Sequence, residues 1–255
     1  MKKIITPKQT EILLLIYRFR FLTRIHIQKF LNHKSDTRIS SWLRDLTQKQ
    51  IISNIYSKNL IIVNKPAIYY LSTKSRSIMK DNKDCNQKLL NRVYREKNRS
   101  DIFKNHWLFI ADLYLFFQEV AQKQNSKLDF YTTTDLVDFA YLTIPLPDIY
   151  IAVKESKKVT KRYFLDCFDE KLPRFVMRKR IVTYFKYYKS NDWQKYIKHP
   201  FPKIMIICPN TFTNNFLSKF IIKTIVEEEV EIKFLLAIKP DIQKRGIQKD
   251  TWEII

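Results

Sequence analysis

Acidic residues in the second half of the sequence have a spacing that suits metal-assisted cleavage of a phosphodiester bond. Pro147-Asp148 opens one expected strand, Asp166 lies near the end of the next, and Asp169-Glu170-Lys171 follows at once. In such chemistry two carboxylates hold a divalent metal, while a lysine orients or activates the attacking water. The candidate catalytic residues are Asp148, Asp166, Asp169, Lys171 and Lys179, with Asp148 and Asp166 as the ligands of Mg²⁺.

This order is that of a PD-(D/E)xK nuclease motif, but the alternation of side chains along a strand argues against a complete copy. Asp166 lies within its strand, and the residue two positions on, which shares its face, is Phe168 rather than lysine. Asp169 has the opposite parity and falls into the turn that follows. A basic residue of the next helix, Lys179 or Arg180, can take the place of the lysine. The pattern therefore favours a nuclease-like core with a degenerate site, and a working Mg²⁺-dependent endonuclease is the alternative.

A second group of polar residues lies on a short helix expected to begin at Ser35-Asp36. Ile39, Leu43 and Leu46 form its apolar stripe, so the outward positions are Thr37, Arg38, Ser41 and Arg44. Arginine bonds guanine edges bidentately, and serine and threonine reach bases or phosphates. Four residues of an expected hairpin suit phosphates or the minor groove, namely Lys58, Asn59, Asn64 and Lys65. The alternative is that both sets are the solvated surface of a module that contacts only proteins.

The charge of the chain favours DNA contact over a purely solvated surface. Lys and Arg number 47 against 25 Asp and Glu, a net charge of +22. Residues 1–100 hold 22 Lys and Arg against 6 Asp and Glu, or +16 of that total. So strong an excess in one segment is typical of a polyanion binder. We therefore expect double-stranded DNA as the partner of this segment.

Composition excludes several other classes of protein. Aromatic residues at 14% and hydrophobic residues at 45% exclude a disordered chain, and the single glycine excludes a glycine-rich phosphate loop. Cys85, Cys167 and Cys208 are far apart and form no CxxC motif, which fits a reducing cytoplasm rather than a disulfide framework. The apolar runs are too short to span a bilayer, so no membrane is expected as a partner.

Capping residues and apolar periodicity predict three helices and a β-hairpin in residues 1–80. Residues suited to N-caps precede apolar-periodic runs at Thr6-Pro7, Thr23 and Ser35-Asp36. Strand-prone runs follow at Ile51–Tyr56, Leu60–Val63 and Ala67–Leu71. This is the order of a winged helix-turn-helix domain, whose third helix enters the major groove.

The rest of the chain predicts a connector and a second domain. Residues 81–100 are polar and basic, and we interpret them as a connector that either touches the DNA backbone or is simply solvated. Residues 101–255 begin with an amphipathic helix over 101–124 and end in a polar tail after Lys239. Between them we expect strands at 128–132, 149–153, 163–167, 204–208 and 232–238, and helices at 172–188 and 212–226. A β-meander followed by β-α-β-α-β order predicts an α/β sheet domain.

Several short segments in this order resemble the replication-relaxation family of plasmid and mobile-element proteins. They are Ile68–Thr73, His106-Trp107-Leu108, Asp112-Leu113-Tyr114, Pro147-Asp148, Tyr163–Asp166, Lys179-Arg180-Ile181 with Tyr184, and Phe201–Ile204. The resemblance covers most of the chain, and it implies a winged-helix half, a nuclease-like half and a role in plasmid replication and DNA relaxation. The chain departs from the family by lacking a glycine near Lys74-Ser75 and by a wider spacing from Asp166 to Asp169.

These features predict a cytoplasmic, sequence-directed duplex-DNA-binding protein that acts in replication initiation or DNA relaxation and mobilisation. One alternative is a Mg²⁺-dependent endonuclease targeted by the winged helix, and another is a transcriptional repressor with a C-terminal oligomerisation domain. Beyond DNA, the partners we consider are replication or mobilisation proteins and a second copy of the chain in a homodimer. No cofactor is expected unless the endonuclease alternative holds.

Overall fold

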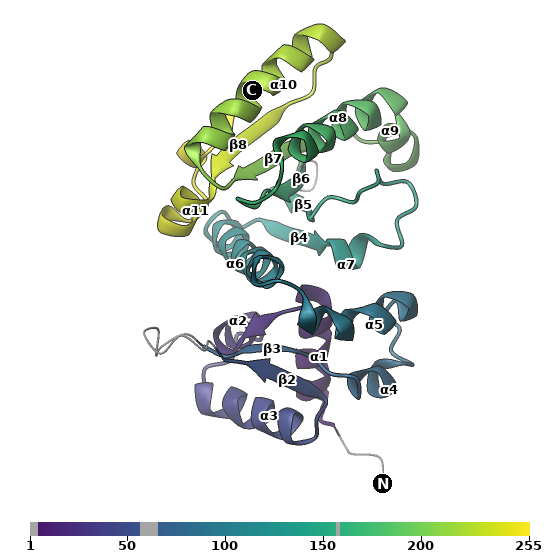
Figure 1. The fold of residues 1–255 in the computed structure, drawn as a ribbon, viewed down its shortest axis with the longest axis vertical. Coiled ribbons are helices and arrows are strands. Elements are labelled where there is room, and N and C mark those ends of the chain that lie inside the picture. The colour runs from purple at the N-terminus through teal and green to yellow at the C-terminus, as the bar shows by residue number, and fades with distance from the viewer. Residues whose placement is uncertain (1–4, 57–65, 157–158) are drawn as a thin grey trace. The chain divides into compact units, whose positions relative to one another are not determined.

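The chain folds into two compact units that divide within one long helix. The computed structural model describes residues 5–56, 66–156 and 159–255. Residues 1–115 form unit 1 and residues 116–255 form unit 2, so the division falls inside α6 (Asp101–Lys123) (Figure 1). The sequence placed the boundary earlier, in residues 81–100. Each unit is described below by itself.

Unit 1 is built from short helices and a three-stranded antiparallel sheet in the order β1-β3-β2. Its elements before α6 are α1 (Pro7–Phe19), β1 (Leu22–Thr23), α2 (Arg24–Phe30), α3 (Asp36–Gln48), β2 (Ile52–Ile55), β3 (Ile68–Leu71), α4 (Ser75–Met79), α5 (Gln87–Val93) and the 3-10 helix η1 (Tyr94–Asn98).

The three helix starts expected from the sequence are confirmed, each with a side-chain cap. Thr6 accepts a hydrogen bond from the backbone N–H of Gln9, whose side chain accepts one from the backbone of Thr6 in return. Thr23 caps α2 in the same reciprocal way with His26, and Ser35 caps α3. Each cap satisfies backbone donors that a helix cannot satisfy itself, so the caps fix where α1, α2 and α3 begin.

The expected hairpin is confirmed where the structure describes it. Strand β2 pairs with β3 from Ile52 opposite Leu71 to Ile55 opposite Ile68. The expected strand Leu60–Val63 lies outside the described residues, as do the four predicted wing contacts Lys58, Asn59, Asn64 and Lys65.

Residues 81–100 are part of unit 1 rather than a separate connector. Cys85, Leu90 and Val93 are buried in its core. The hydroxyl of Tyr17 accepts a hydrogen bond from the backbone N–H of Asn86 at 3.0 Å, which ties the start of α5 to α1. The buried apolar side chains of residues 81–100 attach this segment to the core of unit 1, and its basic side chains are exposed.

Unit 2 is a mixed six-stranded sheet with helices, so the expectation of an α/β domain is confirmed. Its elements after α6 are β4 (Lys127–Thr132), α7 (Thr133–Leu136), β5 (Ile149–Lys154), β6 (Thr160–Cys167), α8 (Arg174–Ser190), α9 (Asp192–Ile197), β7 (Lys203–Cys208), α10 (Thr211–Glu228), β8 (Phe234–Ile238), α11 (Lys239–Arg245), the 3-10 helix η2 (Lys249–Thr251) and β9 (Glu253–Ile254). The strand order is β4-β5-β6-β7-β8-β9. Strands β4 to β6 are antiparallel, β6 to β8 are parallel, and β9 is antiparallel to β8.

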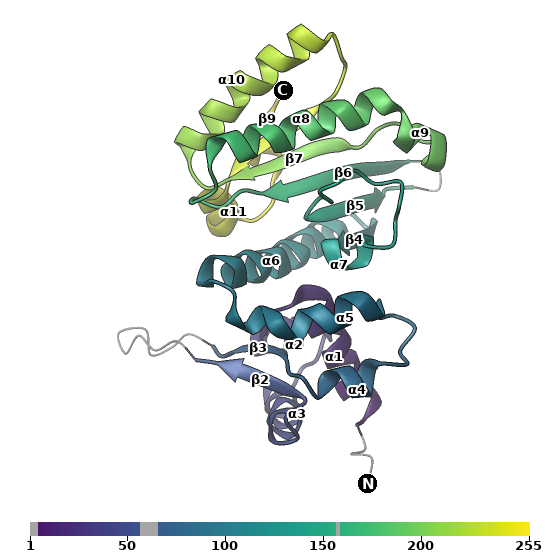
Figure 2. The same cartoon turned by 45° about the vertical axis from the view of Figure 1, so that its right-hand side comes forward.

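Helices α8 and α10 lie on the same side of this sheet (Figure 2). Their inward residues, including Tyr184 and Leu217, pack with Phe164, Ile206 and Phe234 of the strands in one buried cluster. Alternate strand residues such as Leu165 and Met205 therefore point to the opposite face. Asp166 alternates with Leu165 in the same way as Phe164 does, so its side chain faces α8.

The segment after Lys239 differs from the polar tail expected from the sequence. It forms α11, η2 and β9, and Ile242 and Thr251 are buried. Strand β9 completes the sheet by pairing with β8, with Leu235 opposite Ile254. Within the described residues, no helix is both long enough and apolar enough to cross a membrane.

Candidate nucleic-acid interface and carboxylate site

The outward face of α3 presents all four residues predicted from the sequence. Thr37, Arg38, Ser41 and Arg44 are exposed, while Ile39, Leu43 and Leu46 are buried beneath them. Spacings of three and four residues place the exposed set on one side of the helix. The structure thus brings two guanidinium groups and two hydroxyls to a single solvent-facing surface.

Two acidic residues of α3 have partners near this face, and Asp36 accepts a hydrogen bond from the hydroxyl of Thr37 at 3.3 Å. Asp45 accepts a hydrogen bond from the side chain of Gln9 at 2.5 Å and pairs with Lys49 at 2.6 Å. Asp36 lies 3.6 Å from a guanidinium nitrogen of Arg24. Within the described part of the chain, Arg38 and Arg44 form no ion pair, so their charge faces solvent.

The carboxylate site of unit 2 centres on Asp166, which is 4% exposed. Arg180 of α8 donates to both of its oxygens, with Nε 2.5 Å from Oδ2 and Nη2 3.0 Å from Oδ1. The hydroxyl of Tyr184 donates to Oδ2 at 2.8 Å. The backbone N–H of Asp148 donates to Oδ1 at 3.1 Å. Each oxygen of Asp166 therefore accepts two hydrogen bonds, which uses the lone pairs that a carboxylate offers.

Asp148 lies beside Asp166, but its side chain accepts a hydrogen bond from a different donor. Its Oδ2 accepts the backbone N–H of Cys167 at 2.8 Å, and it follows the buried Pro147 at the start of β5. Arg180 also donates from Nη1 to the backbone oxygen of Pro145. Asp148 and Asp166 are thus brought together as the sequence predicted, within a network of hydrogen bonds that also fixes the loop before β5.

The pKa values in this network reflect burial and one strong ion pair. Burial alone would lower the pKa of Arg180, but the carboxylate of Asp166 and the adjacent Tyr184 raise it beyond its ordinary value. Burial raises the pKa of the Tyr184 hydroxyl well above its usual range. Burial, followed by the charges of Asp148 and Asp166, raises the pKa of the Cys167 thiol in the same way. At neutral pH the network therefore contains a charged guanidinium and a neutral phenol.

The two predicted catalytic lysines are exposed and are not the basic groups bonded to Asp166. Lys171 is exposed in the turn after β6, and Lys179 is exposed on the outer face of α8. Asp169 lies in the same turn, near enough to Cys167 for its charge to raise the pKa of that thiol. The basic group that reaches Asp166 is Arg180, the second of the two helix residues considered from the sequence.

A divalent metal does not fit the carboxylate site. The oxygens of Asp166 are saturated by hydrogen-bond donors, and a guanidinium already supplies the positive charge that a metal would bring. Within the described residues, no group of three His, Cys, Asp or Glu side chains could hold a metal ion. The prediction that Asp148 and Asp166 bind Mg²⁺ therefore has no support in this geometry.

The role of Tyr184 went beyond what the sequence indicated. Tyr184 is fully buried against the sheet, in one cluster with Phe164 and Ile206. Its hydroxyl also donates to Asp166, which the apolar pattern could not show. The signal was the spacing of Arg180 and Tyr184, four residues apart on α8, which places both on the side of the helix that faces β6.

Comparisons with known proteins give no family for this chain. No family model matches it, and no curated protein matches it. Among solved structures, one mutant of Lactococcus lactis ZitR is 16% identical with a TM-score of 0.28, and the match covers 48% of this chain and 77% of that chain. A second ZitR mutant is 18% identical, with the same coverage and TM-score. A likeness of this strength carries no argument about function.

Proposed function

We propose that the chain is a sequence-directed, duplex-DNA-binding protein and that unit 1 is a winged helix whose recognition helix is α3. The observation that carries the proposal is the set of exposed residues Thr37, Arg38, Ser41 and Arg44 on one face of α3. The unit also has the element order of a winged helix, with a helix, strand, helix, helix and hairpin. Residues 1–100 hold 22 Lys and Arg against 6 Asp and Glu, a charge that favours a polyanion.

Unit 2 in this proposal is a nuclease-like scaffold that does not cut DNA. Its strand order and the Asp148–Asp166 pair suit such a core, but Arg180 occupies both oxygens of Asp166, where a nuclease would hold a metal. The short sequence segments that resemble the replication-relaxation family support an action on a plasmid or mobile element. There the protein would bind near an origin and serve replication initiation or DNA relaxation.

Selection of a duplex from a random pool, followed by affinity measurements on single variants, tests the binding. We expect Arg38→Ala and Arg44→Ala each to weaken binding to the selected duplex by about 5-fold to 150-fold, the range of one bidentate base contact. Lys219→Ala, which removes an exposed charge from α10, is the matched control and should change affinity little. Equal affinities for all three variants would remove α3 from the interface.

Incubation with supercoiled DNA separates the binding protein from the endonuclease alternative. With Mg²⁺ or Mn²⁺ present, we expect retarded but uncut DNA. Nicked or linear product that requires the metal and disappears in Asp148→Ala would instead establish the endonuclease.

A further inference from the structure

A hollow of about 570 Å³ lies on the face of the unit 2 sheet that is turned away from α8 and α10. Its floor is formed by Tyr163, Met205 and Leu235, which alternate along their strands with residues of the buried cluster beneath α8 and α10. Ligand sites in proteins measure about 300 to 1,000 Å³, so the hollow is large enough for a small molecule or one residue of a polymer.

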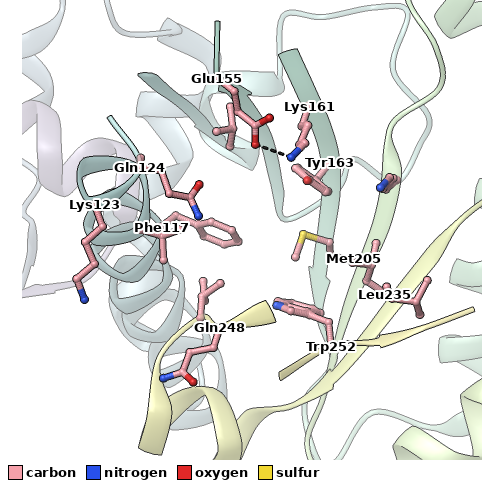
Figure 3. Close-up of a pocket in the computed structure, with 16 residues that line it drawn as sticks. Phe117, Lys123, Gln124, Glu155, Lys161, Tyr163, Met205, Leu235, Gln248 and Trp252 are labelled. Carbon is pink, nitrogen blue, oxygen red and sulfur yellow. Dashed lines mark hydrogen bonds and ion pairs between the residues drawn. The ribbon is translucent and has the colours of Figure 1, made fainter. Parts of the chain in front are cut away.

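Three aromatic rings from three different elements border this hollow. Figure 3 shows Phe117 reaching in from α6, Tyr163 standing on β6, and Trp252 coming from the segment between η2 and β9. Tyr163 and Trp252 are both partly exposed, so their ring surfaces are accessible. The segment that carries Trp252 is held by β9 and by the hydrogen bonds that Asn214 and Ser218 donate to Glu253. The rings are therefore supplied by ordered elements rather than by a free tail.

The rim of the hollow is basic. Lys203 is exposed and stands opposite Tyr163 in the parallel register of β6 and β7, which places the two side chains next to each other on one face. Among the described residues that line the hollow, the one acidic side chain is Glu155, which already pairs with Lys161 at 2.5 Å. Within the described residues Lys203 forms no ion pair, so its ammonium group is available beside an aromatic ring.

We propose that this hollow binds a nucleotide, with the base stacked on Tyr163 or Trp252 and the phosphate held by Lys203. A purely apolar ligand would not need the ammonium group, and an inorganic anion would not need the rings, whereas a phosphorylated base uses both. The side-chain amide of Gln124, which also lines the hollow, can donate to and accept from the edge of a base. The nucleotide is either free or an unpaired residue of a DNA strand. The proposal does not depend on duplex binding by α3.

Photocrosslinking of the full chain locates the site directly. The probes are 5-iodo-deoxyuridine monophosphate and a thymidine hexamer that carries one 5-iodo-deoxyuridine, and the crosslinked peptides are identified by mass spectrometry. We expect crosslinks at Phe117, Tyr163 or Trp252. Crosslinking by both probes or by the monophosphate alone identifies a free nucleotide as sufficient, and crosslinking by the hexamer alone identifies an unpaired strand.

Charge-matched and shape-matched variants decide whether the hollow is responsible. Lys203→Glu should lower the crosslink yield about tenfold, while Lys219→Glu, the same change on α10, should leave it unaltered. Trp252→Leu keeps an apolar side chain but removes the ring surface, and should lower affinity at least about fivefold, the low end for one stacked base. Crosslinks confined to unit 1, or equal losses in the two lysine variants, would overturn the proposal. Arg38→Ala should not change labelling by the monophosphate, so failure of this site is distinct from failure of duplex binding.

Discussion

At the scale of single residues, Arg180 determines what the carboxylate site can do. It is 8% exposed, and its guanidinium is bonded to Asp166, Tyr184 and the backbone of Pro145. Taking two charges out of water is costly, and their attraction offsets this cost only when geometry and further hydrogen bonds are favourable. Here both conditions are met, so the pair fixes the arrangement of α8 against β6.

Removing the guanidinium should therefore leave a buried, uncompensated carboxylate. We expect Arg180→Met to lower the free energy of unfolding by about 3–5 kcal/mol, measured by urea denaturation. Lys179→Met, one position earlier and exposed, is the control and should cost less than about 0.5 kcal/mol. Similar losses in the two variants would show that the ion pair does not stabilise unit 2.

Buried tyrosines predict how stability responds to alkaline pH. Burial raises the pKa of Tyr150 to about 12 from an ordinary value of 10.0, and burial also raises the pKa of Tyr184 well above that ordinary value. A group whose pKa is higher in the folded state contributes its full stability below the unfolded pKa and loses it as pH rises toward the folded value. The free energy of unfolding should thus fall from about pH 10 upward. Denaturation curves of Tyr150→Phe should show a shallower fall over this range, and an unchanged slope would contradict this assignment.

At the scale of secondary structure elements, Gly246 ends α11 in a conformation that other residues rarely adopt. Its φ is 70° and its ψ is −161°. A methyl group there would meet the ring of Phe116 at 3.8 Å, an ordinary contact, so the cost of a side chain is backbone strain rather than a clash. We expect Gly246→Ala to destabilise the protein by about 1–3 kcal/mol in thermal or urea unfolding. Gln243→Ala, on the exposed face of the same helix, should be within about 0.5 kcal/mol of the parent.

Most elements could be predicted because the signals that define them are local. Thr6, Thr23 and Ser35 cap the helices they were expected to cap, and the strands of unit 2 follow apolar runs of the expected length. Strand β9 in the segment after Lys239 could not be predicted, because it has only two residues and is defined by its pairing with β8, with Leu235 opposite Ile254.

The candidate site was predicted only in part, because the sequence shows which residues share a face of a strand but not which face of α8 meets the sheet. Strand alternation correctly separated Asp166 from Asp169, and Asp148 came together with Asp166. The choice between Lys179 and Arg180 required the orientation of α8 on the sheet, which is set by side chains far along the chain. Tyr184 lies four residues after Arg180 and therefore on the same side of α8. The two sides of α8 differ little in polarity, however, so only the tertiary packing shows which side is buried.

At the scale of the whole molecule, the net charge of +22 predicts a strong dependence of DNA binding on salt. Each phosphate that the protein neutralises releases counterions, so affinity falls linearly with salt on logarithmic axes. With about 6–10 phosphate contacts the loss between about 50 and 200 mM salt would be roughly 10³–10⁵-fold. Fluorescence anisotropy across this range measures the slope, and a flat response would exclude electrostatic binding to DNA.

The cation that pairs with Asp166 is the guanidinium of Arg180, which is part of the chain itself. The stability of unit 2 should therefore not depend on the concentration of divalent metal ions in the cell. A protein that relies on bound Mg²⁺ or Mn²⁺ for its folded state loses stability when a chelator or metal starvation removes the ion. A guanidinium cannot be extracted in that way. Unit 2 should consequently keep its melting temperature in EDTA, and a cell depleted of divalent ions would retain the scaffold intact.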